Sequence, residues 1–261
     1  MATLFPWLGG KSRQAARLCR LLPDHACYVE VFFGAGSVFF TKPRAKVEVI
    51  NDIDARLVNL FRIARAHPRE LIRQLRFQTA GRRDFDDYKA QPGLTDIQRA
   101  ARTWFILKCA FGGTGGKSSA TFGYAATGFR GLRRASFGVL LRCHRRLDGV
   151  YIENLDFADL IARYDRSHTL FFCDPPYWQT ADYGISFEWP DHQRLAKALR
   201  SIKGRFLLTI NDHPDIRTLY RGLVIRKVSV SYSVARDKRP SARNRTELII
   251  ANYPLPRQRT K

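Results

Sequence analysis

Short apolar runs rich in β-branched and aromatic residues alternate along this chain with stretches in which apolar residues recur at helical spacing. The short runs are typical of buried strands, and seven are expected, at residues 27–33, 46–50, 149–153, 169–173, 205–210, 223–229 and 246–252. Helices are expected at residues 11–22, 56–66, 69–75, 96–111 and 192–203. This alternation predicts an α/β fold with a doubly wound, mostly parallel sheet.

One interval interrupts the alternation. Residues 51–148 separate the second expected strand from the third, which is far more chain than one crossover connection needs. We therefore expect residues 56–148 to form an inserted, mainly helical subdomain, and residues 1–55 and 149–261 to form the main domain. Inside the insertion, residues 112–131 are too rich in glycine for a helix and predict an exposed loop.

The insertion is also where positive charge concentrates. The whole chain has 45 Lys and Arg against 23 Asp and Glu, a net charge of +22, and residues 56–150 carry 19 basic against 6 acidic residues, or +13. Most of the basic residues are arginines, whose guanidinium groups bind phosphate oxygens in a fork. A nucleic acid, rather than a membrane surface, is therefore the expected partner. The alternative is a basic surface that only keeps the protein in solution.

Several other classes of protein do not fit the sequence. Residues 1–10 lack the basic start and the apolar stretch of a signal peptide, and no run reaches the roughly 20 apolar residues of a membrane-spanning helix. The five cysteines form no C-x-x-C pair, and the six histidines show no spacing typical of metal ligands. We therefore expect a cytoplasmic protein with no disulfide framework, no metal and no membrane contact.

A glycine-containing turn follows the first expected strand, in Glu30-Val-Phe-Phe-Gly-Ala-Gly-Ser37. Gly34 and Gly36 let the backbone turn sharply and approach a ligand closely, at the expected start of a helix. Asp52, just beyond the second strand, would lie at the same edge of the sheet and can accept hydrogen bonds from both hydroxyls of a ribose. The alternative is that Asp52 or Asp54 only caps the following helix.

The most specific motif is Asp174-Pro175-Pro176-Tyr177, directly after the apolar strand at residues 169–173. Two consecutive prolines fix an extended, rigid turn, which presents the Asp174 carboxylate and the Pro175 carbonyl as hydrogen-bond acceptors. An exocyclic amino group that donates to both would lose its conjugation with its ring and turn its lone pair toward an electrophile. Tyr177 then offers a flat face to that ring. A plain structural turn is the alternative, but the position at a strand end favours catalysis.

With these motifs the chain resembles the Dam-type adenine-N6 DNA methyltransferases, which carry the Asp-Pro-Pro-Tyr motif and use S-adenosylmethionine. The resemblance runs over nearly the whole chain and includes Phe5-Pro-Trp-Leu-Gly-Gly-Lys11 and Leu155-Asp-Phe157, although the family often has proline where this chain has Val31. It implies a Rossmann-like seven-stranded methyltransferase sheet with an inserted DNA-recognition subdomain. The implied cofactor-binding residues are Trp7, Lys11, Glu30, Phe32, Gly34, Gly36, Asp52, Asp156, Phe157 and Asp174.

The resemblance also implies individual roles at the cofactor site. Asp52 would hold the ribose hydroxyls, Asp156 would accept a hydrogen bond from the amino group of the cofactor's adenine, and Phe157 would pack on that ring. Asp174 and Pro175 would hold the amine that receives the methyl group.

The implied reaction is transfer of the methyl group of S-adenosylmethionine to N6 of an adenine in double-stranded DNA. Because a base inside a duplex cannot be reached, the adenine would be flipped out and stacked on Tyr177. The alternatives are the same chemistry on cytosine N4 or on an RNA base, and an inactive DNA-binding module.

Expected DNA contacts lie in the glycine-rich part of the insertion and in a basic segment before the last strand. Basic side chains of the insertion would neutralise phosphates, and an aromatic one would fill the gap left by the flipped base. The segment before the last strand is either a phosphate clamp or a solvated loop, and Trp178 either lines the pocket or packs near it. The expected DNA-binding residues are Lys117, Tyr124, Arg130, Arg133, Arg134, Arg236 and Arg243. A glycine-rich loop is compatible with strict or relaxed sequence preference, because direct readout needs positioned side chains.

Overall fold

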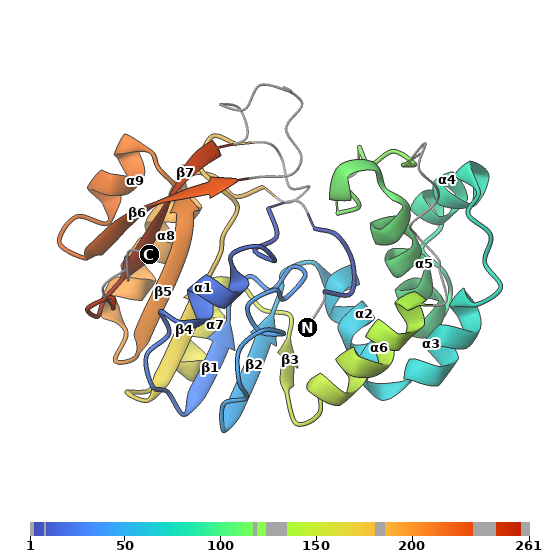
Figure 1. Ribbon diagram of the computed structural model, residues 1–261, viewed down its shortest axis with the longest axis horizontal. Helices are drawn as coiled ribbons and strands as arrows, with labels where there is room; N and C mark the ends of the chain where they lie inside the picture. Colours follow the sequence, from blue (N-terminus) through green and yellow to red (C-terminus); the bar gives the residue numbers. More distant parts are fainter. Residues whose placement is uncertain are drawn as a thin grey trace.

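The computed structural model describes residues 3–7, 9–116, 119–123, 135–180, 186–231 and 244–256. Within these residues seven strands form one sheet in the order β3-β2-β1-β4-β5-β7-β6 (Figure 1). The strands β1 to β5 run parallel, and β7 is antiparallel to β5 and β6. The predicted seven-stranded α/β sheet is confirmed. The strands are β1 (Cys27–Glu30), β2 (Val47–Asn51), β3 (Tyr151–Glu153), β4 (Thr169–Cys173), β5 (Arg205–Asn211), β6 (Val224–Ser231) and β7 (Asn244–Ala251).

The helices follow the prediction in part. Those in the described residues are α1 (Ala15–Cys19), α2 (Ala55–Ala66), α3 (Pro68–Leu75), α4 (Arg82–Ala90), α5 (Asp96–Cys109), α6 (Ala135–Arg146), α7 (Phe157–Tyr164), α8 (Trp189–Ser201) and α9 (Pro214–Leu219), with a 3-10 turn at Phe111–Gly113. The helices α2, α3, α5 and α8 were predicted within a few residues, whereas α1 is much shorter than expected. The helices α4, α6, α7 and α9 were not predicted. For α4 the reason is clear, because Phe85 is its one buried residue and no apolar stripe marks it.

The central strands are buried on both faces of the sheet. Along β4, Leu170 and Phe172 belong to one apolar cluster, which also contains residues of α1 and α2. Phe171 and Cys173 belong to a second cluster, with residues of α7, α8 and α9. Helices therefore cover both faces, as the apolar runs predicted.

The helices α3 to α6 gather at one end of the molecule, beyond the edge strand β3 (Figure 1). Trp104 of α5 and Leu140 of α6 are fully buried in the same apolar cluster as Phe61 of α2 and Phe172 of β4. A smaller cluster around Phe85 lies within this helical part. The insertion predicted from the sequence thus shares its core with the sheet that it interrupts.

No regular helix follows the glycine turn in the described chain, so the prediction of one there was wrong. Residues 34–42 form successive turns, in which Phe40 N–H donates to the Gly36 carbonyl and Lys42 N–H donates to the Val38 carbonyl. The ring of Phe39 packs edge to face on those of Phe33 and Phe40, which lie tilted against each other. Packing of these aromatic side chains into the core, rather than helix propensity, shapes the segment.

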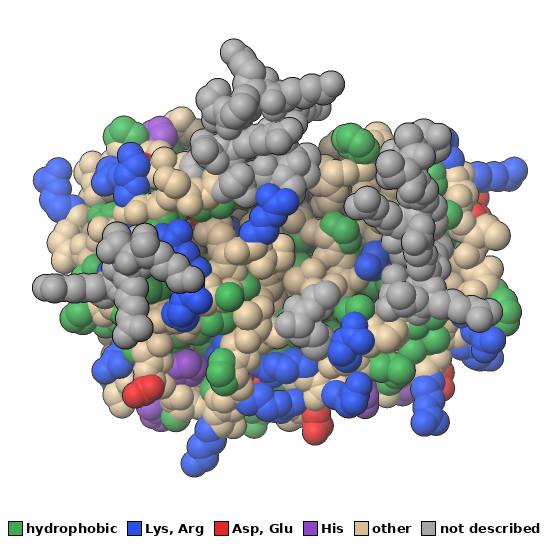
Figure 2. Space-filling model, in the orientation of Figure 1, with side chains coloured by type: hydrophobic (Ala, Val, Ile, Leu, Met, Phe, Trp, Pro, Cys, Tyr) green, Lys and Arg blue, Asp and Glu red, His purple; other side chains and the backbone are tan. Residues whose placement is uncertain are grey.

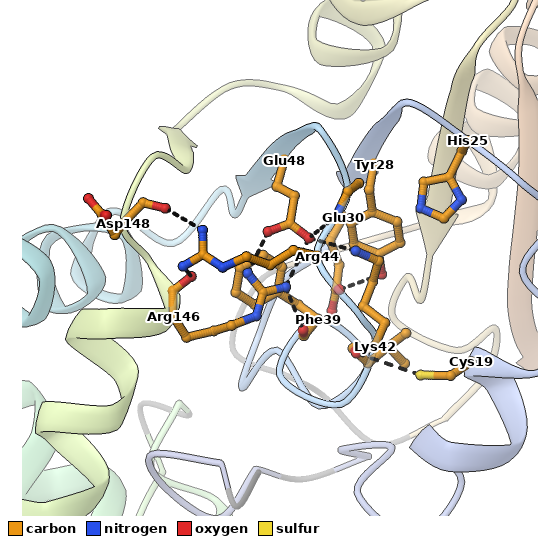
Figure 3. Close-up of polar contacts among 12 residues, drawn as sticks. Cys19, His25, Tyr28, Glu30, Phe39, Lys42, Arg44, Glu48, Arg146 and Asp148 are labelled. Atoms are coloured by element: carbon orange, nitrogen blue, oxygen red, sulfur yellow. Dashed lines mark hydrogen bonds and ion pairs between the residues drawn. The ribbon is translucent and has the colours of Figure 1, made fainter.

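A group of buried charges fastens the end of α6 to the main domain (Figure 3). The carboxylate of Glu48, at the start of β2, accepts hydrogen bonds from Lys42 Nζ at 2.6 Å and from Arg146 Nη2 at 2.9 Å. Arg146 also donates to the Phe39 carbonyl and lies over the Phe39 ring. Next to it, Arg44 donates to the backbone carbonyls of residues 145, 146 and 148, which the end of a helix leaves unpaired. The insertion is therefore held to the loop that follows the glycine turn.

Candidate active site

A cavity lined by described residues lies at the carboxyl ends of β1, β2 and β4, where ligands bind in open α/β sheets. Its lining brings together every residue predicted to bind the cofactor or to catalyse the reaction, although these residues are spread over more than half the chain. They are Trp7, Lys11, Glu30, Phe32, Gly34, Gly36, Asp52, Asp156, Phe157, Asp174, Pro175, Pro176 and Tyr177.

Both glycines of the turn after β1 are required by the backbone. Gly34 and Gly36 have φ of +50° and +65°, in the left-handed region that side chains disfavour. A Cβ at Gly36 would lie 2.3 Å from Cζ of Phe33, and one at Gly34 would lie 2.8 Å from Nε1 of Trp7. Without side chains, the turn brings its backbone against the cavity.

Asp52 is anchored by backbone groups on both of its oxygens. Its Oδ2 accepts from Gly34 N–H at 2.8 Å, and its Oδ1 accepts from Asp54 N–H at 2.9 Å. The helix cap is Asp54, which accepts from Arg56 N–H at the start of α2. Burial raises the pKa of Asp52 to about 6, and the two backbone hydrogen bonds oppose that rise. Each Asp52 oxygen has a second lone pair with which it can bind a ligand.

Glu30 is a second acidic group in the cavity. It is almost fully buried at the end of β1, and the Tyr28 hydroxyl donates to its Oε2 at 2.6 Å. Burial raises the pKa of Glu30 to about 8, and the nearby charge of Asp174 contributes to the rise. A positively charged ligand group beside Glu30 would favour its ionised form.

At the far end of the cavity, Asp156 caps α7 by accepting from Ala158 N–H on Oδ1 at 2.9 Å. The same oxygen accepts from Arg194 Nη2 at 2.9 Å. The guanidinium of Arg194 lies over the Phe157 ring, 4.8 Å from its centroid. These two hydrogen bonds hold the Asp156 carboxylate in one orientation. Its role toward the cofactor's adenine stays a prediction.

Three residues at this end were missed by the sequence analysis. Phe187 packs against Phe32 and Phe157 with ring centroids 5.6 Å away from each, and it lines the cavity together with Ser186 and Asp191. They stand just before α8 and at its first turn. No local pattern marks them, because their proximity to α7 depends on how the two helices pack.

The Asp174-Pro175-Pro176-Tyr177 segment follows β4, as predicted, but Asp174 is more fully engaged than the motif suggested. Lys11 Nζ lies 2.8 Å from both carboxylate oxygens, and the Thr209 hydroxyl donates to Oδ1 at 2.7 Å. Lys11 also donates to the Gly9 carbonyl and lies over the Tyr177 ring. The N-terminal segment therefore contacts both ends of the predicted catalytic motif through Lys11.

Behind this motif lies Glu247 of β7, which is 1% exposed. Gln14 Nε2 donates to its Oε2 at 3.1 Å. Burial raises the pKa of Glu247, while the charge of Lys11 and the hydrogen bond from Gln14 oppose the rise. A second carboxyl group on the antiparallel strand thus lies near enough to Lys11 for their charges to interact.

Trp178 packs near the site. Its backbone N–H donates to Asn211, its indole N–H donates to Asp215, and its ring lies against those of Trp189 and His192. Of the two roles considered from the sequence, packing is the one these contacts describe.

The predicted DNA-binding residues Lys117, Tyr124, Arg130, Arg133, Arg134, Arg236 and Arg243 lie outside the described residues. Among the described residues, no group of three or more His, Cys, Asp or Glu is placed to hold a metal ion. None of the helices in the described ranges is both long and apolar enough to cross a membrane.

Comparison with known proteins agrees with these motifs. The chain is 26% identical to the Type II methyltransferase M.CviBI of Paramecium bursaria Chlorella virus NC1A, over 97% of this chain and 100% of that protein. It is 27% identical to the DNA N-6-adenine-methyltransferase of Escherichia phage P1, over 84% of this chain but 31% of that longer protein. It is 24% identical to the DNA adenine methylase of Salmonella typhi, over 95% of this chain and 93% of that protein.

The match to a family covers most of the chain. Residues 7–234 match the D12 class N6 adenine-specific DNA methyltransferases, a range that contains the glycine turn, the whole insertion and the Asp174-Pro175-Pro176-Tyr177 motif. The chain therefore belongs to the D12 class N6 adenine-specific DNA methyltransferases.

Proposed function

We propose that this enzyme transfers the methyl group of S-adenosylmethionine to N6 of a flipped-out adenine in double-stranded DNA. The observation that carries the proposal is the meeting of the Asp174-Pro175-Pro176-Tyr177 motif, the glycine turn and Asp52 around one cavity. The family supplies adenine as the base and DNA as the substrate.

The cavity fits S-adenosylmethionine in shape and in charge. The two glycines let the turn pack closely against the Trp7 and Phe33 rings beside the cavity, and Asp52 has lone pairs for two ribose hydroxyls. Phe32, Phe157 and Phe187 offer an apolar, aromatic end for a purine. The acidic lining suits a positively charged molecule, and when bound S-adenosylmethionine supplies an electrophilic methyl group on a sulfonium.

The chain's own groups would prepare the amine for direct transfer. Asp174 and the Pro175 carbonyl would accept its two N–H groups, which turns the nitrogen lone pair out of conjugation and toward the methyl group. Tyr177 would stack on the flipped base. Lys11 and Thr209 keep the Asp174 carboxylate in place, so that little reorganisation is needed in the transition state.

We assign DNA recognition to residues 56–148, in which positive charge concentrates. Figure 2 shows Lys and Arg side chains spread over the visible face of the molecule, with few acidic side chains among them. Such a surface favours association with a polyanion and makes it dependent on salt.

The test is the identity of the product. The enzyme is incubated with S-adenosylmethionine and unmethylated duplex DNA, and the nucleosides are then separated and identified. The same reaction is run in parallel with RNA. N6-methyl-2′-deoxyadenosine from the duplex supports the proposal, whereas N4-methyl-2′-deoxycytidine, methylation of RNA alone, or no product would contradict it. Sequencing the methylated duplex then shows which adenines are modified and how strict the preference is.

Asp52 gives a prediction for cofactor binding. Only the ionised carboxylate can accept from the ribose at both oxygens, and its pKa is about 6. We expect affinity for S-adenosylhomocysteine to fall as the pH is lowered from 7 to 5, measured by titration calorimetry. Asp52→Asn should weaken binding at pH 7 by about 1 to 3 kcal/mol and remove that pH dependence.

The matched control is Asp54→Asn, because asparagine also caps helices well and Asp54 does not hold the glycine turn. It should keep wild-type affinity at pH 7, and since the Asp54 charge contributes to the raised pKa of Asp52, the fall in affinity should move to lower pH rather than disappear. An Asp52→Asn variant with the wild-type affinity and pH profile would show that Asp52 has no part in cofactor binding.

A further inference from the structure

Thr209 touches the catalytic motif from the neighbouring strand. It lies on β5, fully buried, and its hydroxyl donates to Oδ1 of Asp174 at 2.7 Å. The register between β4 and β5 pairs Cys173 with Leu208. Asp174 follows Cys173 and Thr209 follows Leu208, so these two residues lie side by side. The sheet itself therefore brings the hydroxyl to the carboxylate.

The hydrogen bonds to Asp174 determine which of its lone pairs is left for a substrate. A carboxylate offers about four lone-pair positions, two on each oxygen. Thr209 uses one on Oδ1, and Lys11 lies 2.8 Å from both oxygens, which engages one position on each. The position that remains is on Oδ2.

We propose that Thr209 is a positioning residue for methyl transfer, because it occupies Oδ1 of Asp174 and leaves Oδ2 to accept the target amine. The inference rests on the proposed function, in which Asp174 holds the amine during the reaction. It assigns to β5 a direct part in orienting the catalytic carboxylate.

Thr209 is better suited to fix this orientation than Lys11 is. Its β-branched side chain has few accessible rotamers, and complete burial in the sheet restricts it further. Lys11 is also buried and bonded to the Gly9 carbonyl, but its Nζ lies 2.8 Å from both Asp174 oxygens and therefore does not distinguish one from the other. Loss of the Thr209 hydroxyl would leave Asp174 paired with Lys11 but without the hydrogen bond that singles out Oδ1.

The test compares Thr209→Val, which keeps the shape but removes the hydroxyl, with Thr209→Ser, which keeps the hydroxyl. The matched control is Thr169→Val. Thr169 is also buried and lies on the adjacent strand β4, but its hydroxyl donates to the backbone carbonyl of Tyr164 at 2.8 Å. All variants are checked for thermal stability, and kcat, KM for DNA and the Kd of S-adenosylhomocysteine are measured.

We expect Thr209→Val to lower kcat roughly 10- to 100-fold, as for loss of a hydrogen bond to a charged group, with KM and Kd within about twofold of wild type. Thr209→Ser should recover most of the wild-type kcat. Thr169→Val should keep the wild-type kcat even if it loses as much thermal stability as Thr209→Val does.

Equal kcat values for Thr209→Val and Thr169→Val would overturn the positioning role of Thr209 but would leave the proposed function standing. A Thr209→Ser variant as slow as Thr209→Val would also overturn it, since shape and not the hydroxyl would then matter. Absence of adenine methylation by the wild-type enzyme would instead overturn the proposed function, and this inference with it.

Discussion

Asp174→Asn is expected to reduce methyl transfer by at least about 100-fold while the protein keeps its fold and its affinity for the cofactor. In the proposed reaction the carboxylate acts on the target amine as positive charge develops on the amine nitrogen, so the charge of Asp174 would matter most in the transition state. The amide keeps the size of the side chain and one acceptor oxygen. Lys11, whose side chain is 3% exposed, therefore keeps a hydrogen-bond partner in the variant.

The structure also explains why alanine is the poorer test at this position. Asp174→Ala would remove both the acceptor for the amine and the counter-charge of the buried Lys11. Removing one partner of a buried ion pair is costly, so lost activity would be mixed with lost stability. Asp174→Asn also removes that counter-charge but leaves Lys11 an acceptor oxygen, so stability should fall in both variants and further in Asp174→Ala.

The measurement is the single-turnover rate on duplex DNA, with calorimetry for S-adenosylhomocysteine. Asp165→Asn serves as control, because Asp165 precedes β4, at the end of the strands away from the cavity. Its carboxylate accepts hydrogen bonds from the backbone N–H groups of Lys203 and Gly204. Turnover by Asp174→Asn at near the wild-type rate would exclude Asp174 from catalysis.

Features carried by contiguous residues could be predicted from the sequence. The apolar run at Thr169–Cys173 is the strand β4 to the residue, and the two glycines and the proline pair lie at strand ends as expected. Local sequence determines these features, because turns and buried strands need particular residues at adjacent positions. The prediction of a helix after the glycine turn was wrong, because side-chain packing there overrides the local preference for helix.

Contacts between distant segments could not be predicted in this way. Lys11 and Asp174 are 163 residues apart, and Thr209 reaches Asp174 only because β5 lies beside β4 in the sheet. The sequence placed Lys11 and Asp174 in one site by resemblance, but their pairing follows from strand order and register. The same holds for Phe187 and Arg194, which reach α7 through the packing of α8.

The buried charges around Glu48 are a further case, because charged residues are usually expected at the surface. In Figure 3, Lys42 and Arg146 point toward the Glu48 carboxylate from two different segments of the chain. The side chains of Glu48, Lys42 and Arg146 are only 3%, 2% and 12% exposed. Burial would raise the pKa of Glu48, but the hydrogen bonds from Arg146 and Lys42 outweigh this and lower it.

Glu48→Ala is therefore expected to destabilise the protein by about 3 to 5 kcal/mol, because it leaves two buried cations without a counter-charge. The free energy of unfolding from denaturant titration measures the loss. The control is Asp87→Ala, which removes an exposed pair with Arg83 on α4 and should cost less than about 1 kcal/mol.

The pH dependence separates loss of charge from loss of packing. Since the pKa of Glu48 is lowered in the folded protein, its stabilising charge is fully present above the ordinary pKa of a glutamate, near 4.5. That contribution is lost as the pH falls through the lowered pKa, so the deficit of Glu48→Ala should be constant from pH 7 to 5 and shrink below about pH 4.5. Replacing Lys42, Glu48 and Arg146 together by apolar residues should restore much of the stability, as no buried charge is left unpaired. A Glu48→Ala variant as stable as Asp87→Ala at pH 7 would show that these charges do not hold the insertion to the sheet.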